Sequence, residues 1–230
     1  ELAVDVVDIS SEIPLDPSDP FWTNSNHIKP ISIDLGPQMI TNPRWPDPST
    51  KSVKLSAVQN NSEIALLLEW DDATLENKIE VSSTHTDQAA IMFPLSPDKE
   101  VPLITMGSEN EIVNIWQWLA IWEKSLNTKS RSSDRNLKMS AFGNDRPSSV
   151  EDLTAAGYST LTTQEEQDVL GRGTWEGNTW RVVFKRSLVN SDNADIQFKY
   201  PIAMAIAVWN GGNGERNGQK GISSWILLRL

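Results

Sequence analysis

The residues in this chain with the clearest potential for chemistry are Met106 and Lys220, because the more common metal ligands are scarce. The 230-residue sequence contains no cysteine and only two histidines, His27 and His85. The usual ligand sets for zinc, for iron–sulfur clusters and for covalently attached haem are therefore missing. A chain of this composition can still bind haem iron through a methionine thioether and a neutral lysine amine.

Both residues lie in predicted loops. Met106 is followed by Gly107, and a thioether at the end of a strand can face a pocket. Lys220 lies between Gly218 and Gly221, just before the last predicted strand. Spacing alone favours a core methionine and a solvated lysine. An unperturbed lysine has a pKa of about 10.4, so a lysine ligand would need an apolar pocket to lower that value.

Other motifs point to ordinary structural roles. The glycine-rich segments 171–177 and 212–218 have three residues before the last glycine, where the dinucleotide-binding motif has two, which favours hairpin turns. Asp71 and Asp72 are adjacent, so on a strand they would point to opposite faces rather than form a glycosidase pair. His85 lacks a Gly-x-Ser-x-Gly elbow. A hydrolase that uses His85 stays open as a third alternative.

The composition limits the classes of partner. The net charge is −11 and no basic stripe occurs, which excludes nucleic acid as a natural partner. The longest apolar stretch, 200–209, is far shorter than the ~20 residues of a membrane-spanning helix. Because the chain begins at Glu1, we expect that an N-terminal segment, such as an export signal, has been removed.

The pattern of apolar residues predicts an all-β fold, an antiparallel β-sandwich with a few short helices, in one domain over 1–230. Strands are expected within 53–57, 64–70, 87–93, 113–118, 180–184, 202–209 and 222–230. Prolines interrupt residues 1–50, which predicts an extended arm over the domain, held by Phe21, Trp22 and Trp45. The polar stretch 124–174 predicts a long surface excursion.

Seven segments, in this order, resemble a known family. They are WDDAT (70–74), DQAAIMFP (87–94), IWQW (115–118), GTW (173–175), WRVVFKR (180–186), AIAVWNG (205–211) and KGISSW (220–225). Together they resemble the haem b-binding γ subunits of type II dimethyl sulfoxide reductase-family molybdoenzymes, the group that includes ethylbenzene dehydrogenase. The resemblance covers most of the chain from about Pro14 onward.

The resemblance implies one non-covalent haem b held by a β-sandwich, with a methionine and a lysine as axial ligands. Met106 matches the family's methionine and Lys220 matches its lysine, with Lys185 and Lys199 as alternatives for the second ligand.

Four further residues complete the predicted haem site. Trp209 and Trp225 flank the Lys220 loop and would wall the pocket, and Arg186 or Arg216 would pair with a haem propionate.

The family's role predicts a periplasmic, soluble, non-catalytic subunit that relays electrons between an iron–sulfur β subunit and a soluble c-type cytochrome. Substrate chemistry would occur on a molybdenum α subunit, and we favour nitrite or nitrate as the substrate. The alternative is a cofactor-free carbohydrate-binding β-sandwich, for which the ten tryptophans would supply flat platforms. Exposed tryptophans would favour this alternative, whereas buried ones would favour the haem protein.

Overall fold

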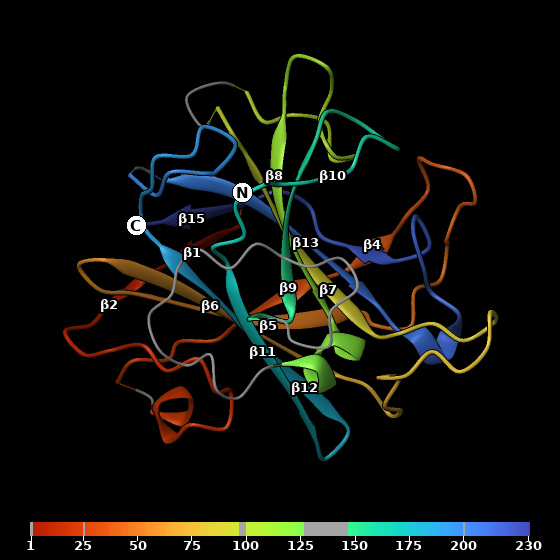
Figure 1. The fold of residues 1–230 in the computed structure, drawn as a ribbon, viewed down its shortest axis with the longest axis horizontal. Helices are drawn as coiled ribbons and strands as arrows, with labels where there is room; N and C mark the ends of the chain where they lie inside the picture. Colours follow the sequence, from red (N-terminus) through yellow and green to blue (C-terminus); the bar gives the residue numbers. More distant parts are fainter. Residues whose placement is uncertain (1, 25, 97–99, 127–146, 200) are drawn as a thin grey trace.

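The computed structural model describes residues 2–24, 26–96, 100–126, 147–199 and 201–230. Within these residues two sheets pack face to face, as the ribbon in Figure 1 shows. The helices are short 3-10 turns, namely η1 (Pro20–Thr23), η2 (Ala120–Ser125) and η3 (Gly211–Asn213). The predicted all-β sandwich with a few short helices is confirmed, although each sheet also contains one parallel strand pair, so the sheets are mixed rather than purely antiparallel. The described residues contain no helix with the length and apolar character needed to cross a bilayer.

The larger sheet has nine described strands. Its order is β1 (Ala3–Asp5), β15 (Ile226–Arg229), β13 (Ile202–Trp209), β7 (Gln88–Pro94), β8 (Val113–Leu119), β9 (Val150–Ala155) and β10 (Thr162–Thr163), with β14 (Gly221–Ile222) beside β13 and β4 (Gly36–Pro37) beside β14. The smaller sheet has six described strands. Its order is β11 (Leu170–Glu176), β12 (Thr179–Ser187), β6 (Glu63–Asp71), β5 (Ser52–Gln59) and β2 (Val7–Asp8), with β3 (Ile31–Asp34) also paired to β5.

The core between the sheets follows from the two-residue period of a strand. In β13, the side chains of Ile202, Met204, Ile206 and Val208 pack into the shared core, together with Leu66 and Leu68 of β6 on the facing sheet. The alternate residues of β13 point outward. The outer face of the larger sheet is therefore free to carry a second, smaller apolar cluster.

Residues 2–24 run along the edges of both sheets, with Val4 and Val6 in the core between them. β1 pairs in parallel with β15 in the larger sheet, and β2 pairs in parallel with β5 in the smaller one, so one short segment joins both sheets. Further along, Trp22 is buried and its indole N–H donates to the carbonyl of Pro14. Trp22 and Ile13 cover the outer face of the smaller sheet over Ala65 and Leu67.

The structure differs from the predicted surface excursion at 124–174. The segments 150–155 and 170–176 are strands β9 and β11, and β9 buries Val150, Asp152, Leu153 and Ala155. The prediction was wrong here because a buried aspartate was taken as a sign of exposure, although the amide of Asn114 binds the Asp152 carboxylate inside the sandwich. Residues 127–146 of the predicted excursion lie outside the described residues.

Gly173 in β11 tests how tightly this part of the core is packed. A Cβ atom at Gly173 would lie 2.5 Å from the ring of Trp118, which is itself held edge-on against Trp180. We expect Gly173→Ala to lower the free energy of unfolding by about 1–3 kcal/mol in a urea titration. Gly36→Ala is the matched control, because its nearest new contact would be an ordinary 3.8 Å. Equal losses in the two variants would contradict the steric explanation.

Candidate functional site

A cavity of about 450 Å³ opens on the outer face of the larger sheet. This volume falls within the roughly 300–1,000 Å³ range of ligand and cofactor sites. Its floor consists of the outward side chains of β7, β8 and β13. In register across the floor lie Gln117, Ala90 and Ala207 in one row and Ile115, Met92 and Ala205 in the next.

The floor is low because its centre is made of alanines. Ala90 of β7 is paired with Ala207 of β13, and Ala205 lies one outward position along. An alanine side chain extends only one carbon from the sheet, so this apolar surface leaves room for a flat ligand to lie against the strands. The sequence Ala-Ile-Ala-Val-Trp at 205–209 thus encodes both a core face and a pocket floor.

Met106 enters the cavity from a strongly constrained loop. Its backbone lies in the left-handed region at φ 70°, and Gly107 follows at φ 77°. Only glycine fits at position 107, because a Cβ there would lie 2.2 Å from the carbonyl oxygen of Glu111. The Gly107 N–H donates to Leu103 and the Met106 carbonyl accepts from Gly157. Non-glycine residues in this conformation cluster at functional sites, and here the loop is held at both ends.

Lys220 enters the same cavity from the loop that follows η3. Its amine lies 4.7 Å from the centre of the Trp209 ring, so the cation rests on an aromatic face. Burial lowers the pKa of Lys220 to about 8, and no carboxylate offsets this effect among the residues that the structure describes. A neutral amine is therefore far more accessible here than on an ordinary surface lysine.

Trp225 reaches the cavity's apolar cluster through an irregularity in the last strand. Ile222 pairs with Ala207, but Ile226 pairs with Met204, so one extra residue is inserted between β14 and β15. The insertion allows Ile222 and Trp225, three positions apart, both to lie on the outer face. The Trp225 indole N–H donates to the carbonyl of Pro102 at 3.1 Å, next to the Met106 loop. The predicted unbroken strand over 222–230 is therefore wrong at this bulge.

Buried carboxylates hold the Lys220 loop, and the sequence analysis did not predict this role for them. Glu215 is fully buried and accepts hydrogen bonds from Trp45, Ser49 and Asn210, which ties the N-terminal arm to this loop. Asp87 accepts from the Gly211 backbone N–H at 2.9 Å, where η3 begins. Such partners become visible only when segments more than a hundred residues apart are brought together.

The predicted site residues fall into two groups. The structure brings Met106, Lys220 and Trp209 to the cavity lining, with Trp225 packed behind. It places Arg186 elsewhere: this side chain is buried within the sandwich beside Asp195, between the rings of Trp116 and Phe198. The predicted propionate contact of Arg186 is therefore wrong.

The alternative lysines lie outside this cavity lining. Lys185 is buried against the arm, where its amine donates to the Ile13 carbonyl at 3.0 Å, and Lys199 is exposed. Arg216 is exposed next to Asn217, which lines the cavity, and binds the Gly214 carbonyl. Lys220 is thus the lysine that geometry places with Met106.

Comparison with known proteins identifies the family of this chain. A family model described as ethylbenzene dehydrogenase matches residues 19–221. The chain belongs to this family. The resemblance to the γ subunits of type II dimethyl sulfoxide reductase-family molybdoenzymes is thereby confirmed, and the matched range contains Met106 and Lys220.

Three relatives are similar over most of this chain. A protein of Haloferax mediterranei, provisionally named as a respiratory nitrate reductase heme subunit, is 25% identical over 98% of this chain and 71% of its own length. The chlorate reductase γ subunit of Ideonella dechloratans is 27% identical over 79% of this chain and 66% of its own length. The dimethylsulfide dehydrogenase γ subunit of Rhodovulum sulfidophilum is 27% identical over 71% of this chain and 54% of its own length. This chain therefore spans only part of each relative.

The sandwich also occurs in a distant solved structure. The structure of this chain is similar to a crystal structure of a Bacteroides uniformis protein that is provisionally named as carbohydrate-binding. The similarity covers 99% of each chain, with a TM-score of 0.50 and 9% sequence identity. At this identity the likeness shows the fold alone.

Two buried acids, Asp72 and Asp87, should make the free energy of unfolding depend on pH in a distinct way. Burial, and then the charge of Asp72, raises the pKa of Asp87 to about 7, and burial raises that of Asp72 to about 6, from 3.8. The folded state therefore holds protons that the unfolded state has lost, so the free energy of unfolding should fall as pH rises from about 4 to about 7. Asp72→Asn removes one of these carboxyl groups and lowers the pKa of Asp87. In urea titrations at several pH values, the free energy of unfolding of this variant should therefore change less with pH than that of the wild type.

Asp71→Asn is the matched control, because Asp71 is the exposed neighbour on the same strand end. It should leave the slope between pH 4 and 7 close to that of the wild type. A wild-type slope in Asp72→Asn, or a reduced slope in both variants, would contradict this assignment.

Proposed function

We propose that this chain is the haem b electron-transfer subunit of a molybdenum oxidoreductase complex, and that it holds one non-covalent haem between Met106 and Lys220. The observation that supports this most directly is that these two residues, in loops more than a hundred positions apart, line one cavity in a chain of the ethylbenzene dehydrogenase family. The γ subunits and the heme subunit among its relatives support the same role.

The residues present fit such a group. Met106 offers a soft thioether that favours reduced iron and raises the potential. Lys220 offers an amine whose pKa burial lowers to about 8, which eases the loss of a proton that ligation requires. The alanine floor gives a flat macrocycle an apolar surface to lie on.

The bound haem would supply one-electron transfer. Two protein ligands leave no open coordination position, so the chain would pass electrons rather than bind substrate at iron. The Met106 loop, held at both ends, would keep the thioether in place, and Trp209 would keep water from the Lys220 amine.

The rim of the cavity provides polar groups for the propionates. Thr41 and Asn217 lie in its lining, and Arg216 is adjacent to Asn217 in sequence. With Arg186 placed in the core, we propose Arg216 as the charged partner of a propionate, since arginine pairs well with carboxylates.

The proposed setting follows the relatives. We propose an iron–sulfur β subunit and a molybdenum α subunit as permanent partners, a soluble c-type cytochrome as a transient one, and a periplasmic location. The acidic surface, with a net charge of −11, would steer a basic cytochrome toward the complex. Nitrate or nitrite remains the favoured substrate, supported by the Haloferax relative's name.

The carbohydrate-binding alternative has less support. All ten tryptophans lie in described parts of the chain, six of them buried and four half-buried. Five of the buried ones, among them Trp70, Trp118 and Trp180, pack inside the protein and cannot offer a platform to a sugar, whereas the sixth, Trp209, lines the cavity.

The test of ligation is an absorption spectrum of the purified holo-protein, oxidised and reduced, with a pyridine haemochrome assay. We expect a b-type spectrum with one haem per chain. Met106→Leu and Lys220→Leu each replace a ligand side chain with an apolar one that has no ligand atom, so each should change the spectrum and weaken haem binding by at least about tenfold.

Met92→Leu and Lys199→Leu are the controls, since Met92 lines the same cavity without the constrained loop and Lys199 is exposed. Both should keep the wild-type spectrum. A spectral change in Met92→Leu but not in Met106→Leu would overturn the ligand assignment, and a colourless protein that takes up no added haem would overturn the function.

The alanine floor provides a second test. Ala205→Phe should fill the cavity and abolish haem uptake while the circular dichroism spectrum stays that of a β-sandwich. Ala203→Phe places the same bulk on the same face of β13, outside the cavity lining, and should leave haem content unchanged. Equal haem content in both variants would place the cofactor elsewhere.

A further inference from the structure

The loop that carries Lys220 is held on both sides of this residue by one short piece of the N-terminal arm. After Lys220, Gly221 of β14 pairs with Pro37 of β4. Before Lys220, the carbonyl of Gly218 accepts a hydrogen bond from the side-chain amide of Gln38, at 2.9 Å. Two adjacent residues of the arm therefore fix the backbone two positions before Lys220 and one position after it.

The side chain of Gln38 is 4% exposed, and both ends of its amide are used. Its Nε2 atom lies between 2.9 and 3.2 Å from the carbonyls of Thr41, Pro43 and Gly218. Its Oε1 atom accepts from the backbone N–H groups of Ile40 and Thr41, each at 2.7 Å. Because a carbonyl can only accept and an N–H can only donate, one orientation of this amide satisfies all of its partners.

The same amide shapes a loop at the mouth of the cavity, here called the mouth loop (residues 38–45). The backbones of Gln38 and Trp45 hydrogen-bond to each other at its base. Ile40 and Thr41 line the cavity, and Ile40 is 63% exposed, so the loop lies at the opening. Five of its eight residues are exposed, so apolar packing holds little of it. Its shape therefore depends mainly on the hydrogen bonds of Gln38.

We infer that Gln38 is a positioning residue for the cofactor, because it fastens the Lys220 loop and the mouth loop to each other through the Gly218 carbonyl. This inference rests on the proposed function, since it concerns the lysine that is proposed as an iron ligand. Gln38 would act through Lys220 rather than on the cofactor directly, because backbone groups already occupy its own polar atoms.

The position of the Lys220 backbone matters because a lysine side chain is long and flexible. An amine bound to iron must lie at one distance and in one direction. The ring of Trp209, 4.7 Å from the amine, directs the end of the side chain, and the Trp209 indole N–H donates to the carbonyl of Asn217 at 2.9 Å. Gln38 and β4 hold the backbone from which the side chain extends. Removal of groups that orient a metal ligand typically weakens metal binding by about 10–100-fold.

The competing role for Gln38 is stabilisation of the fold alone. Truncation of this side chain leaves backbone carbonyls without a donor, so either role predicts a lower unfolding temperature. The two roles differ in what happens at the iron. Only a positioning role changes the ligation of iron in protein that is still folded.

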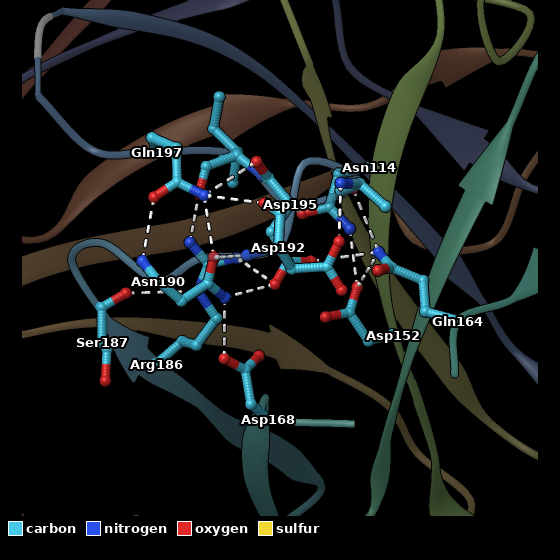
Figure 2. Close-up of polar contacts among 12 residues, drawn as sticks. Asn114, Asp152, Gln164, Asp168, Arg186, Ser187, Asn190, Asp192, Asp195 and Gln197 are labelled. Atoms are coloured by element: carbon cyan, nitrogen blue, oxygen red, sulfur yellow. Dashed lines mark hydrogen bonds and ion pairs between the residues drawn. The ribbon is translucent and has the colours of Figure 1, made fainter. Parts of the chain in front are cut away.

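The test compares Gln38→Ala with Gln197→Ala in the purified holo-protein. Gln197 is the matched control because its amide also fastens a loop, as Figure 2 shows. Its Nε2 atom donates to the carbonyls of Asp192 and Asp195. Its Oε1 atom accepts from the backbone N–H of Asn190 at 2.9 Å. Gln197 lies outside the lining of the cavity. Both variants should lower the unfolding temperature.

We expect Gln38→Ala to raise the rate of haem loss to excess apomyoglobin by at least about tenfold. Its oxidised haem should also show a high-spin fraction in absorption and electron paramagnetic resonance spectra, as expected for iron that has lost one of two protein ligands. Gln197→Ala should keep the wild-type rate of haem loss and a low-spin spectrum.

A wild-type spectrum and rate of haem loss in Gln38→Ala would overturn the positioning role, and so would equal changes in the two variants. Either result would leave the proposed function intact if the wild type binds haem. A wild type that takes up no haem would overturn the proposed function and this inference with it.

Should Gln38→Ala fail to fold, Gln38→Glu is the second variant. Glutamate keeps the volume of the side chain and the oxygen that accepts from Ile40 and Thr41, and it loses only the group that donates to Gly218. It should show the same high-spin fraction and faster haem loss, and unchanged values would contradict the inference.

Discussion

The burial of both faces of β7, β8 and β13 is the constraint on which the rest of the structure depends. A strand with two buried faces must use its two-residue period to separate two environments. In β13, Ile206 and Val208 fill the core between the sheets, while Ala205 and Ala207 form a low outer floor. The pocket is therefore a direct result of residue size on one face of a strand, rather than of a gap between elements.

Loops over this floor are held by buried carboxylates rather than by apolar packing alone. Glu215 draws Trp45 of the arm to the loop that carries Lys220, and Asp87 fixes the start of η3. Hydrogen bonds to charged groups contribute about 1.5–3 kcal/mol each, more than neutral ones. They also have direction, which a hydrophobic contact lacks. Such anchors explain how a polar loop keeps a lysine over the ring of Trp209.

The sequence predicted most strands, because segments such as 64–70 and 202–209 carry strong β patterns, and the strand predicted at 113–118 is also present. It also identified the loops of Met106 and Lys220 through family resemblance. It missed β9 because Asp152 is buried by partners distant in sequence. Arg186 was misplaced for the same reason, since nothing local marks a guanidinium that pairs inside the sandwich.

The short segment that joins both sheets has a consequence for how the chain folds. β1 pairs with β15, so residues near one end of the chain complete a sheet only with residues near the other. Contacts of such sequence separation slow folding, because a long loop must close before they form. Until residues 226–229 are available, β1 has no partner in the larger sheet, and this edge of the sandwich stays open. A domain built in this way folds late and as a whole.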